Sequence, residues 1–386
     1  MNKEIRSEII KNSKICLRPF EYFTVEQNGD VFCCCPAYTN QYILGNVLEQ
    51  SFDEIWNGKK WKKFRKNIYE NKYSKCNLDM CYGMEQWCFV DKNQIKQAKY
   101  PKYASLCIDN ACNIICLFCR DKIKYAYPYF TKNNLRLNKY KYQFFSLLKK
   151  LHLYNKNNYL INTERIGGTL LKELIDEAEF IEKHIKKIDN FYIPMLREAK
   201  ILMLNGAGEV FVSEFCKKLL KKTTVKYPNL KYQILTNGLL CDEEHLKKLN
   251  LADKLDIVIV SLHAATEQTY NKIIIGSDFN RVIENVKYLA KLKKENKIND
   301  VLVSFVISSL NYKDLPEFVE MAYSIGVNPV MWEVRDINDC RFCKEIEKYN
   351  ICSKNHPEHE KLLEVLQNPV FKKYNIITNN LVSESD

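Results

Sequence analysis

Three closely spaced cysteines carry the clearest chemical signal in the chain. Cys112, Cys116 and Cys119 follow a C-x3-C-x2-C spacing. Three thiolates this close together can hold three corners of a cubane iron–sulfur cluster and leave the fourth iron without a protein ligand. Such an open iron can bind and activate a small molecule, which a fully ligated electron-transfer cluster cannot do. A zinc site would require a fourth ligand, and ferredoxin runs supply a fourth cysteine.

The triad resembles the signature of the radical SAM superfamily, in which the open iron chelates the amino and carboxylate groups of S-adenosylmethionine. Asn113, directly after the first cysteine, and the aromatic Phe118, directly before the third, also fit that signature. The resemblance implies a 4Fe–4S cluster held by the three cysteines, with S-adenosylmethionine bound to it and Phe118 close by.

A glycine-rich segment further along the chain resembles the superfamily motif that contacts the amino group of S-adenosylmethionine. It runs Gly206-Ala207-Gly208-Glu209, after a predicted strand at Ile201–Leu204. Glycines let backbone oxygens approach a ligand closely, and a carboxylate can stabilise an ammonium group. The resemblance implies that Gly206, Gly208 and Glu209 contact the cofactor, whereas taken alone the segment would be an ordinary turn.

Polar residues at the ends of later predicted strands also resemble superfamily positions. Thr236-Asn237-Gly238 is either a ligand contact or a strand-to-helix turn. The resemblance implies that Ser261 and Asn311 lie at the cofactor, although helix capping would also explain Asn311. His263 is expected to be a structural hydrogen-bond partner rather than a catalytic acid.

The sequence departs from the superfamily pattern at Ile275. Relatives commonly have an arginine there, just before a glycine, and in some of them it pairs with the cofactor carboxylate. Lys272 or Arg281 is a possible substitute, but a lysine cannot form the bidentate contact of a guanidinium.

Residues 1–100 contain a second group of cysteines, namely Cys16, Cys33, Cys34, Cys35, Cys76, Cys81 and Cys88. This part has little regular periodicity and is expected to need a metal staple. Its opening, from Cys16 through Gly29 to Cys34, resembles the SPASM or twitch domains that carry auxiliary iron–sulfur clusters, although in most relatives that domain follows the catalytic one. Zinc remains the alternative.

The ligand set expected for one auxiliary cluster is Cys16, Cys34, Cys76 and Cys81. Cys88 is a possible substitute, and Cys33 or Cys35 could replace Cys34. The later cysteines Cys340, Cys343 and Cys352 are left unassigned.

The elements that must position these residues are alternating strands and helices. Short apolar runs bounded by turns predict strands, and amphipathic segments between them predict helices. The strands are Ile201–Leu204, Lys231–Thr236, Leu255–Ser261, Val301–Ile307 and Pro329–Val334; the helices are Glu243–Leu249, Asn280–Lys294 and Leu315–Ile325. The spacing favours parallel crossovers, with the ligand at the carboxyl ends of the strands.

The predicted architecture is therefore α/β, with a parallel-sheet partial (β/α) barrel after a small cysteine-rich iron–sulfur domain. We expect that domain at residues 1–100, the core at 101–340 with an inserted helical segment at 122–162, and a C-terminal tail at 341–386. In the first part, a capping box at Ser51 predicts one helix with Trp56, Trp61 and Phe64 on its apolar side.

Composition and charge indicate the cell compartment and the partners to expect. The chain has 386 residues and a net charge of +12, and its lysines lie mostly on predicted helical faces. It has neither a signal peptide nor an apolar run long enough to span a bilayer, so we expect a cytoplasmic protein without a membrane partner. The positive charge suits an acidic electron donor of the flavodoxin or ferredoxin type. Nucleic acid is not expected as a partner, because no binding motif is recognisable.

The resemblance implies an oxidoreductase that cleaves S-adenosylmethionine reductively and abstracts hydrogen from a substrate. A peptide or protein substrate is narrowly favoured over a small molecule such as a sugar or aminocyclitol. A non-catalytic iron–sulfur or zinc scaffold is the alternative class, and Ile275 is its best support.

Overall fold

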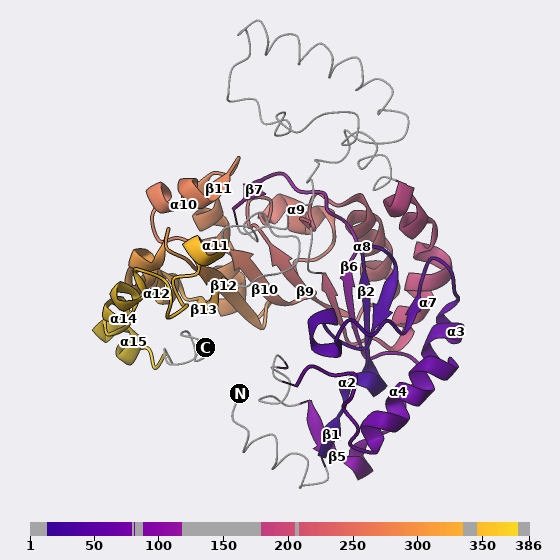
Figure 1. Cartoon of the computed structure of the whole chain (residues 1–386). Coiled ribbons are helices and arrows are strands. Elements are labelled where there is room, and N and C mark those ends of the chain that lie inside the picture. The colour runs from indigo at the N-terminus through magenta and orange to yellow at the C-terminus, as the bar shows by residue number, and fades with distance from the viewer. Residues whose placement is uncertain are drawn as a thin grey trace, which may run out of the picture. The chain divides into compact units, whose positions relative to one another are not determined.

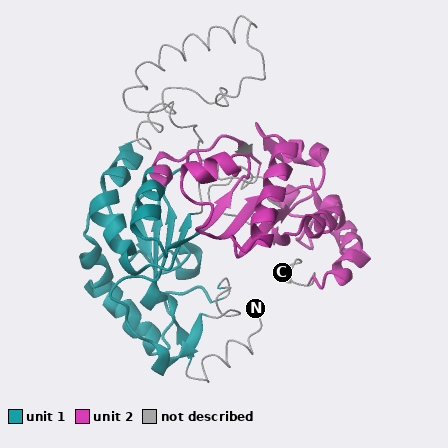
Figure 2. Ribbon diagram, turned by 180° about the vertical axis from the view of Figure 1, so that it is seen from behind, with its two compact units in different colours: residues 1–109, 179–206, 218–232 teal, residues 110–178, 207–217, 233–386 magenta. Residues whose placement is uncertain are grey.

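The computed structural model describes residues 14–78, 81, 88–117, 179–204, 208–334 and 346–376. The insertion predicted at residues 122–162 lies outside the described residues, and so do Phe118, Cys119, Gly206, Cys340 and Cys343. The chain divides into two compact units (Figure 2). The first comprises residues 1–109, 179–206 and 218–232, and the second comprises residues 110–178, 207–217 and 233–386.

Five strands of the first unit form a mixed sheet in the order β8-β6-β2-β3-β4. β2 (Tyr22–Glu26) runs parallel to β6 (Tyr103–Cys107), and β6 runs parallel to β8 (Ile201–Leu204). β3 (Asp30–Phe32) and β4 (Gly45–Asn46) extend the sheet with antiparallel pairing. Separately, β1 (Lys14–Cys16) pairs antiparallel with β5 (Phe89–Asp91).

After Cys16, β2 and β3 form an antiparallel hairpin. Its turn contains Gly29, whose φ of +85° favours glycine, and a Cβ there would lie 2.7 Å from Asn46 Oδ1. The Asn46 side chain in turn donates hydrogen bonds to Asn28 O and Asp30 Oδ1, both at 3.0 Å. The turn between Cys16 and the Cys33–Cys34 pair is therefore fixed both by the backbone conformation of Gly29 and by the hydrogen bonds of Asn46.

The predicted capping box at Ser51 is present, but the single helix expected after it is divided in two. Ser51 Oγ accepts from the Glu54 backbone N–H, and the Glu54 carboxylate accepts from the Ser51 N–H, at the start of α3 (Phe52–Trp56). The chain then turns at Gly58 before α4 (Lys59–Tyr69). A Cβ at Gly58 would lie 2.1 Å from the Glu54 carbonyl oxygen, so this turn depends on a glycine.

Aromatic side chains form the core of the first unit, as predicted for the apolar side of these helices. Trp56, Trp61 and Phe64 are all buried. Trp61 stacks on Phe23 of β2 with ring centroids 5.4 Å apart, and Trp56 packs edge-on against Trp61 at 4.8 Å. The unit also contains the short helices α2 (Arg18–Glu21) and α7 (Ile193–Met195) and most of the longer α8 (Glu214–Lys226).

The sheet of the second unit has the order β13-β12-β10-β9. β10 (Leu255–Ser261) runs parallel to β12 (Asp300–Ile307), and β12 runs parallel to β13 (Asn328–Glu333). β9 (Lys231–Thr236) belongs to this unit from Gln233 on. The sheet is open, because β13 pairs only with β12 among the described residues.

The strands and helices predicted for this half of the chain are confirmed to within one residue at each end. The predicted helices are α9 (Glu243–Lys248), α11 (Phe279–Lys294) and α12 (Leu315–Ile325), and α10 (Glu267–Ile273) lies between α9 and α11 in the sequence; Figure 1 shows them beside the strands they connect. Asp242 caps α9, since its carboxylate accepts from the His245 backbone N–H at 3.0 Å. This is the mixed α/β architecture with parallel strands that the sequence predicts.

Within residues 346–376, which the structure describes, three short helices follow β13, namely α13 (Ile346–Tyr349), α14 (His359–Leu366) and α15 (Pro369–Lys373). They occupy the region expected as a tail, and the end of this region packs against α12. Tyr374 stacks on Tyr323 with ring centroids 4.0 Å apart, and Lys373 forms an ion pair with Glu320 at 2.7 Å.

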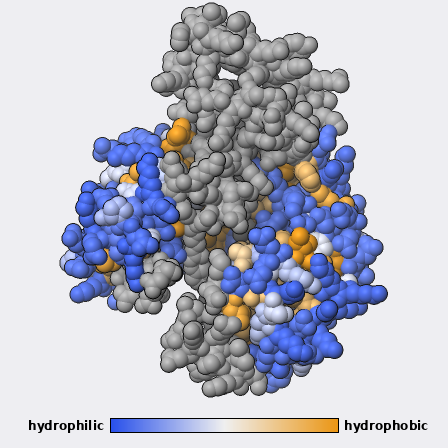
Figure 3. Space-filling view, viewed as in Figure 1, coloured by the Kyte–Doolittle hydropathy of each residue, from blue (hydrophilic) through white to orange (hydrophobic). Residues whose placement is uncertain are grey.

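Hydrophilic residues cover most of the described surface on the face shown in Figure 3, with hydrophobic residues in small groups between them. Within the described ranges, every helix is too short or too polar to cross a bilayer.

Candidate functional site

The cysteine loop of the second unit is held by a short two-stranded ladder. β7 (Ile115–Cys116) pairs antiparallel with β11 (Ile274–Ile275), with Cys116 opposite Ile274. The next residue continues the contact, because the Leu117 N–H donates to Ile273 O at 2.8 Å. Cys112 and Cys116 are both half-buried, whereas the third cysteine lies outside the described residues.

Glu209 is the buried centre of a polar network beside this loop. Glu209 is only 1% exposed. Oε1 accepts from Thr236 Oγ1 at 2.8 Å, and Oε2 accepts from the Asn237 N–H at 2.8 Å. The Glu209 N–H donates to Ala111 O at 2.7 Å, directly before Cys112. Glu209 therefore joins the glycine-rich segment, the end of β9 and the cysteine loop.

Asn237 extends the network to the first cysteine. Its Nδ2 donates to Asn113 Oδ1 at 2.8 Å and approaches Cys112 Sγ at 3.8 Å. Its Oδ1 accepts from the Leu239 N–H at 3.0 Å, which fixes the orientation of the amide. The three motifs that the sequence places far apart thus meet within one unit of the structure.

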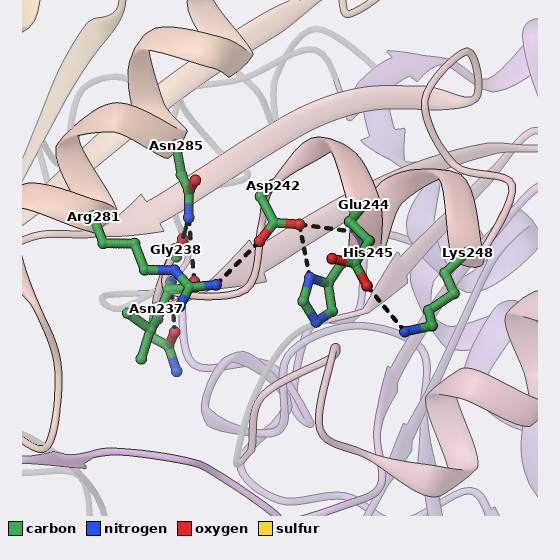
Figure 4. Close-up of polar contacts among 9 residues, drawn as sticks. Asn237, Gly238, Asp242, Glu244, His245, Lys248, Arg281 and Asn285 are labelled. Atoms are coloured by element: carbon green, nitrogen blue, oxygen red, sulfur yellow. Dashed lines mark hydrogen bonds and ion pairs between the residues drawn. The ribbon is translucent and has the colours of Figure 1, made fainter.

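The turn after β9 requires the glycine of the Thr236–Gly238 motif. Gly238 has φ of +80°, and a Cβ there would lie 2.7 Å from Val260 Cγ1. Asn285 of α11 donates to Gly238 O at 2.8 Å, as Figure 4 shows. Asn285 is itself buried, so α11 sets the position of the turn that carries Asn237.

The position where relatives carry an arginine lies in the ladder that holds the cysteine loop. Ile275 pairs with Ile115 and is 52% exposed. Of the two suggested substitutes, Lys272 is exposed on α10. Arg281 instead pairs with Asp242, with Nη2 at 3.3 Å from Oδ2 (Figure 4). Partial burial raises the pKa of Asp242, but hydrogen bonds from His245 and Arg281 outweigh it and hold that pKa below its usual value.

His263 and Asn311 form a second buried network at the ends of β10 and β12. Asn311 Nδ2 donates to His263 O and Val306 O, and its Oδ1 accepts from the backbone N–H and hydroxyl of Ser308. His263 Nδ1 accepts from the Val306 N–H at 3.1 Å. Burial lowers the pKa of His263 to about 4, so the imidazole is neutral near pH 7. These contacts support the structural role expected for His263.

The remaining expected cofactor contacts lie close in sequence to these networks. Ser261 is half-buried at the carboxyl end of β10, where it is opposite Ser304 of β12. Gly208 is half-buried directly before Glu209. Their contacts with a cofactor stay predictions, as do those of Phe118 and Gly206.

In the first unit, the cysteines predicted to bind an auxiliary cluster lie near one another. Cys88 and Cys16 form a hydrogen bond that raises the pKa of the Cys16 thiol and lowers that of Cys88. A hydrogen bond between Cys33 and Cys34 lowers the pKa of Cys34, and the positive charge of Arg18 lowers it further. Burial and the nearby Cys34 and Cys81 raise the pKa of Cys76 to about 12.

Comparison with known proteins identifies this part of the chain. Residues 16–82 match the family described as "SPASM: Iron-sulfur cluster-binding domain". A curated "Probable GTP 3',8-cyclase" of Saccharolobus islandicus is 36% identical over 95 residues, which make up 25% of this chain and 29% of that protein. Residues 16–82 therefore form a SPASM-type domain. The chain spans less than a third of the length of these curated relatives.

Solved structures give weaker likenesses. "Native anSMEcpe with bound AdoMet" is 17% identical, with a TM-score of 0.35 over 71% of this chain and 61% of that one. "Structure of TYW1 with a lysine-pyruvate adduct bound" is 14% identical, with a TM-score of 0.34 over 69% of this chain and 71% of that one. Neither likeness is close enough to carry an argument.

The donor set of the SPASM domain suits an iron–sulfur cluster, which takes thiolate ligands. Cysteines dominate the site, and two arginines face them: Arg18 lies beside Cys16, Cys34 and Cys88, and Arg65 lies near Cys33. In the part of the chain that the structure describes, no three Cys, His, Asp or Glu side chains are close enough to ligate one metal ion.

Sequence reasoning missed both arginines. Arg65 interrupts the apolar side of α4 between Phe64 and Ile68, and a charged residue in such a position was the available signal. Arg18, two residues after Cys16, has no comparable signal, because its neighbours are brought to it only by folding.

Glu209→Ala should lower the free energy of unfolding by about 2–3 kcal/mol, because buried donors on Thr236 and Asn237 would lose their acceptor. Glu209→Gln keeps an acceptor oxygen, and the Thr236 hydroxyl can reverse its role, so its loss should be about 1 kcal/mol. Urea denaturation of the reconstituted full chain measures both. The exposed Glu317→Ala is the control, with an expected change within about 0.5 kcal/mol. Equal losses for the three variants would show that the network does not stabilise the fold.

Proposed function

We propose that this chain is a radical SAM enzyme whose Cys112, Cys116 and Cys119 ligate a 4Fe–4S cluster with an open iron. The network from Glu209 through Asn237 to Cys112 is the observation that supports this most directly. A chance cysteine triad would have no reason to meet a buried carboxylate and a strand-end asparagine. The same network joins the three motifs beside the carboxyl end of β9, which supports a shared site.

Bound at this site, the cluster would supply one electron for the cleavage of S-adenosylmethionine to methionine and a 5'-deoxyadenosyl radical, which takes a hydrogen atom from the substrate. The protein's own residues bind and orient the reactants. Gly206, Gly208 and Glu209 are proposed to receive the methionine ammonium group, with Phe118, Ser261 and Asn311 around the rest of the cofactor. Glu209 already serves three protein donors, so its contribution to the ammonium would come through the remaining lone pairs and its charge.

An acidic electron donor of the flavodoxin or ferredoxin type is proposed to reduce the cluster. The net charge of +12 supports such a partner, since opposite charges speed association.

The SPASM domain is proposed to hold one auxiliary iron–sulfur cluster. Cys16, Cys34 and Cys76 remain the proposed ligands, and either Cys81 or Cys88 supplies the fourth. The contacts favour Cys88, because its thiol forms a hydrogen bond with the thiol of Cys16. In addition, the Cys88 carbonyl oxygen accepts from the Leu17 N–H at 2.7 Å. Cys81 interacts with Cys76 instead.

A peptide or protein is the proposed substrate class, on the resemblance of the cysteine-rich domain to those of peptide-modifying relatives. A nucleotide or another small molecule is the second candidate, and the match to curated GTP 3',8-cyclases over a quarter of the chain favours it.

Cys116→Ala should reduce 5'-deoxyadenosine formation to background, because the cluster would lose one of its ligands. The measurement is chromatography with mass detection after anaerobic incubation of reconstituted protein with S-adenosylmethionine and dithionite. Cys216→Ala is the matched control, since this buried cysteine on α8 lies outside the proposed sites. Background levels in the unmodified protein would favour the non-catalytic scaffold.

Cys88→Ala should remove the auxiliary cluster, whereas Cys81→Ala should retain it. Each change is made in a full chain that also carries Cys112→Ala, Cys116→Ala and Cys119→Ala, so the iron and sulfide that remain belong to the SPASM domain. Loss in the Cys81 variant and retention in the Cys88 variant would restore the ligand set expected from the sequence.

Deuterium should pass from a deuterated peptide pool to 5'-deoxyadenosine, because the radical takes hydrogen from its substrate. A tryptic digest of proteins from cells grown in heavy water provides the pool, and ribose-deuterated GTP provides the comparison. Mass spectrometry of 5'-deoxyadenosine reads both, with Cys116→Ala as the blank. Deuterium from GTP alone would replace the peptide proposal with the nucleotide one.

A further inference from the structure

Two arginines of the SPASM region each keep one buried N–H group without an acceptor. Arg65 is 4% exposed, and its Nε and Nη1 donate to Pro19 O at 2.9 Å and Trp56 O at 2.8 Å. Its Nη2 has no hydrogen-bond partner in the described part of the chain, and neither has the buried Nε of Arg18. Buried donors are normally paired, so each orphan indicates an acceptor still to be supplied.

The charges of these arginines are equally uncompensated by carboxylates. Among the residues the structure describes, the charged partners of the two guanidinium groups include no Asp or Glu. The groups that do interact with them are thiols: Arg18 donates hydrogen bonds to Cys34 and Cys88, and Arg65 interacts electrostatically with Cys33. A buried cation is costly unless an anion accompanies it.

Aromatic rings hold both guanidinium groups in place. Arg65 Cζ lies 4.1 Å from the ring centroid of Trp56 and 5.3 Å from that of Trp61. Arg18 Cζ lies 5.3 Å from the ring centroid of Tyr22. Stacking of this kind fixes the plane of the guanidinium, so neither arginine can readily turn outward to solvent.

We propose that Arg18 and Arg65 are positioning residues that form a cationic shell around the auxiliary cluster and raise its reduction potential. The inference rests on the proposed function, because it requires that cluster to be present. Thiolates and sulfides would provide the missing anion and the missing acceptors. Reduction adds one negative charge to the cluster, so a fixed cation stabilises the reduced form more than the oxidised form.

A purely structural role is the competing explanation. Arg65 joins Pro19 O to Trp56 O, and such a staple would stabilise the fold without affecting any redox centre. The two roles separate in measurement, because a staple changes unfolding and a cationic shell changes a potential.

The experiment compares Arg18→Gln and Arg65→Gln with Arg18→Lys and Arg65→Lys. All are made in the full chain that lacks the cysteine triad, so that the auxiliary cluster gives the only iron–sulfur signal. Redox titration followed by electron paramagnetic resonance yields the midpoint potential. The matched control is Lys62→Gln, which removes an exposed positive charge from the same helix as Arg65.

Each glutamine variant should show a lower midpoint, with the oxidised-to-reduced ratio at the parent's midpoint raised about tenfold, equivalent to about 59 mV for one electron. The lysine variants should shift less, and Lys62→Gln should not shift. If a glutamine variant loses the cluster, retention by its lysine counterpart supports the proposal, and loss from both overturns it. Midpoints that match the Lys62→Gln control also overturn it. If the chain that lacks only the cysteine triad contains no iron and sulfide, the auxiliary cluster itself is refuted.

Discussion

A buried carboxylate has to be surrounded by hydrogen-bond donors, and in this protein that requirement joins three loops. Glu209 is almost completely buried and accepts from Thr236 and Asn237, while its own backbone N–H donates to the residue before Cys112. If any of the three loops moved away, a charge or a donor would be left unpaired in a medium where that is costly. The position of the cysteine loop is therefore coupled to the carboxyl end of β9.

The first unit depends on the packing of aromatic rings rather than on a buried carboxylate. It has short strands and short helices, and its core depends on large rings such as Trp56, Trp61 and Phe23. Trp56 and Trp61 also stack on Arg65, which lies near Cys33, so the same residues serve both packing and electrostatics. A cluster in this unit would complete the charge balance of the domain as well as cross-link it.

Regular elements were predictable where a local pattern determined them. Apolar runs bounded by turns located β10 and β12 to within one residue, because burial on both faces of a parallel sheet produces continuous apolar strands. The amphipathic pattern located α12 equally well. The break between α3 and α4 was not predictable from periodicity, because the helical pattern continues through Gly58 and only a close approach of the Glu54 carbonyl shows why a glycine is there.

The sequence by itself determined which reactive groups the chain contains. The cysteine spacing, the glycine-rich segment and the cysteine-rich start of the SPASM domain are local patterns, and their meaning depends on residue type and separation. Only the tertiary structure decided which of these groups meet. The contacts of Asn237 with Cys112 and of Arg18 with Cys34 and Cys88 join residues that are remote in the chain. Such pairings follow from strand order and helix packing, which no single segment encodes.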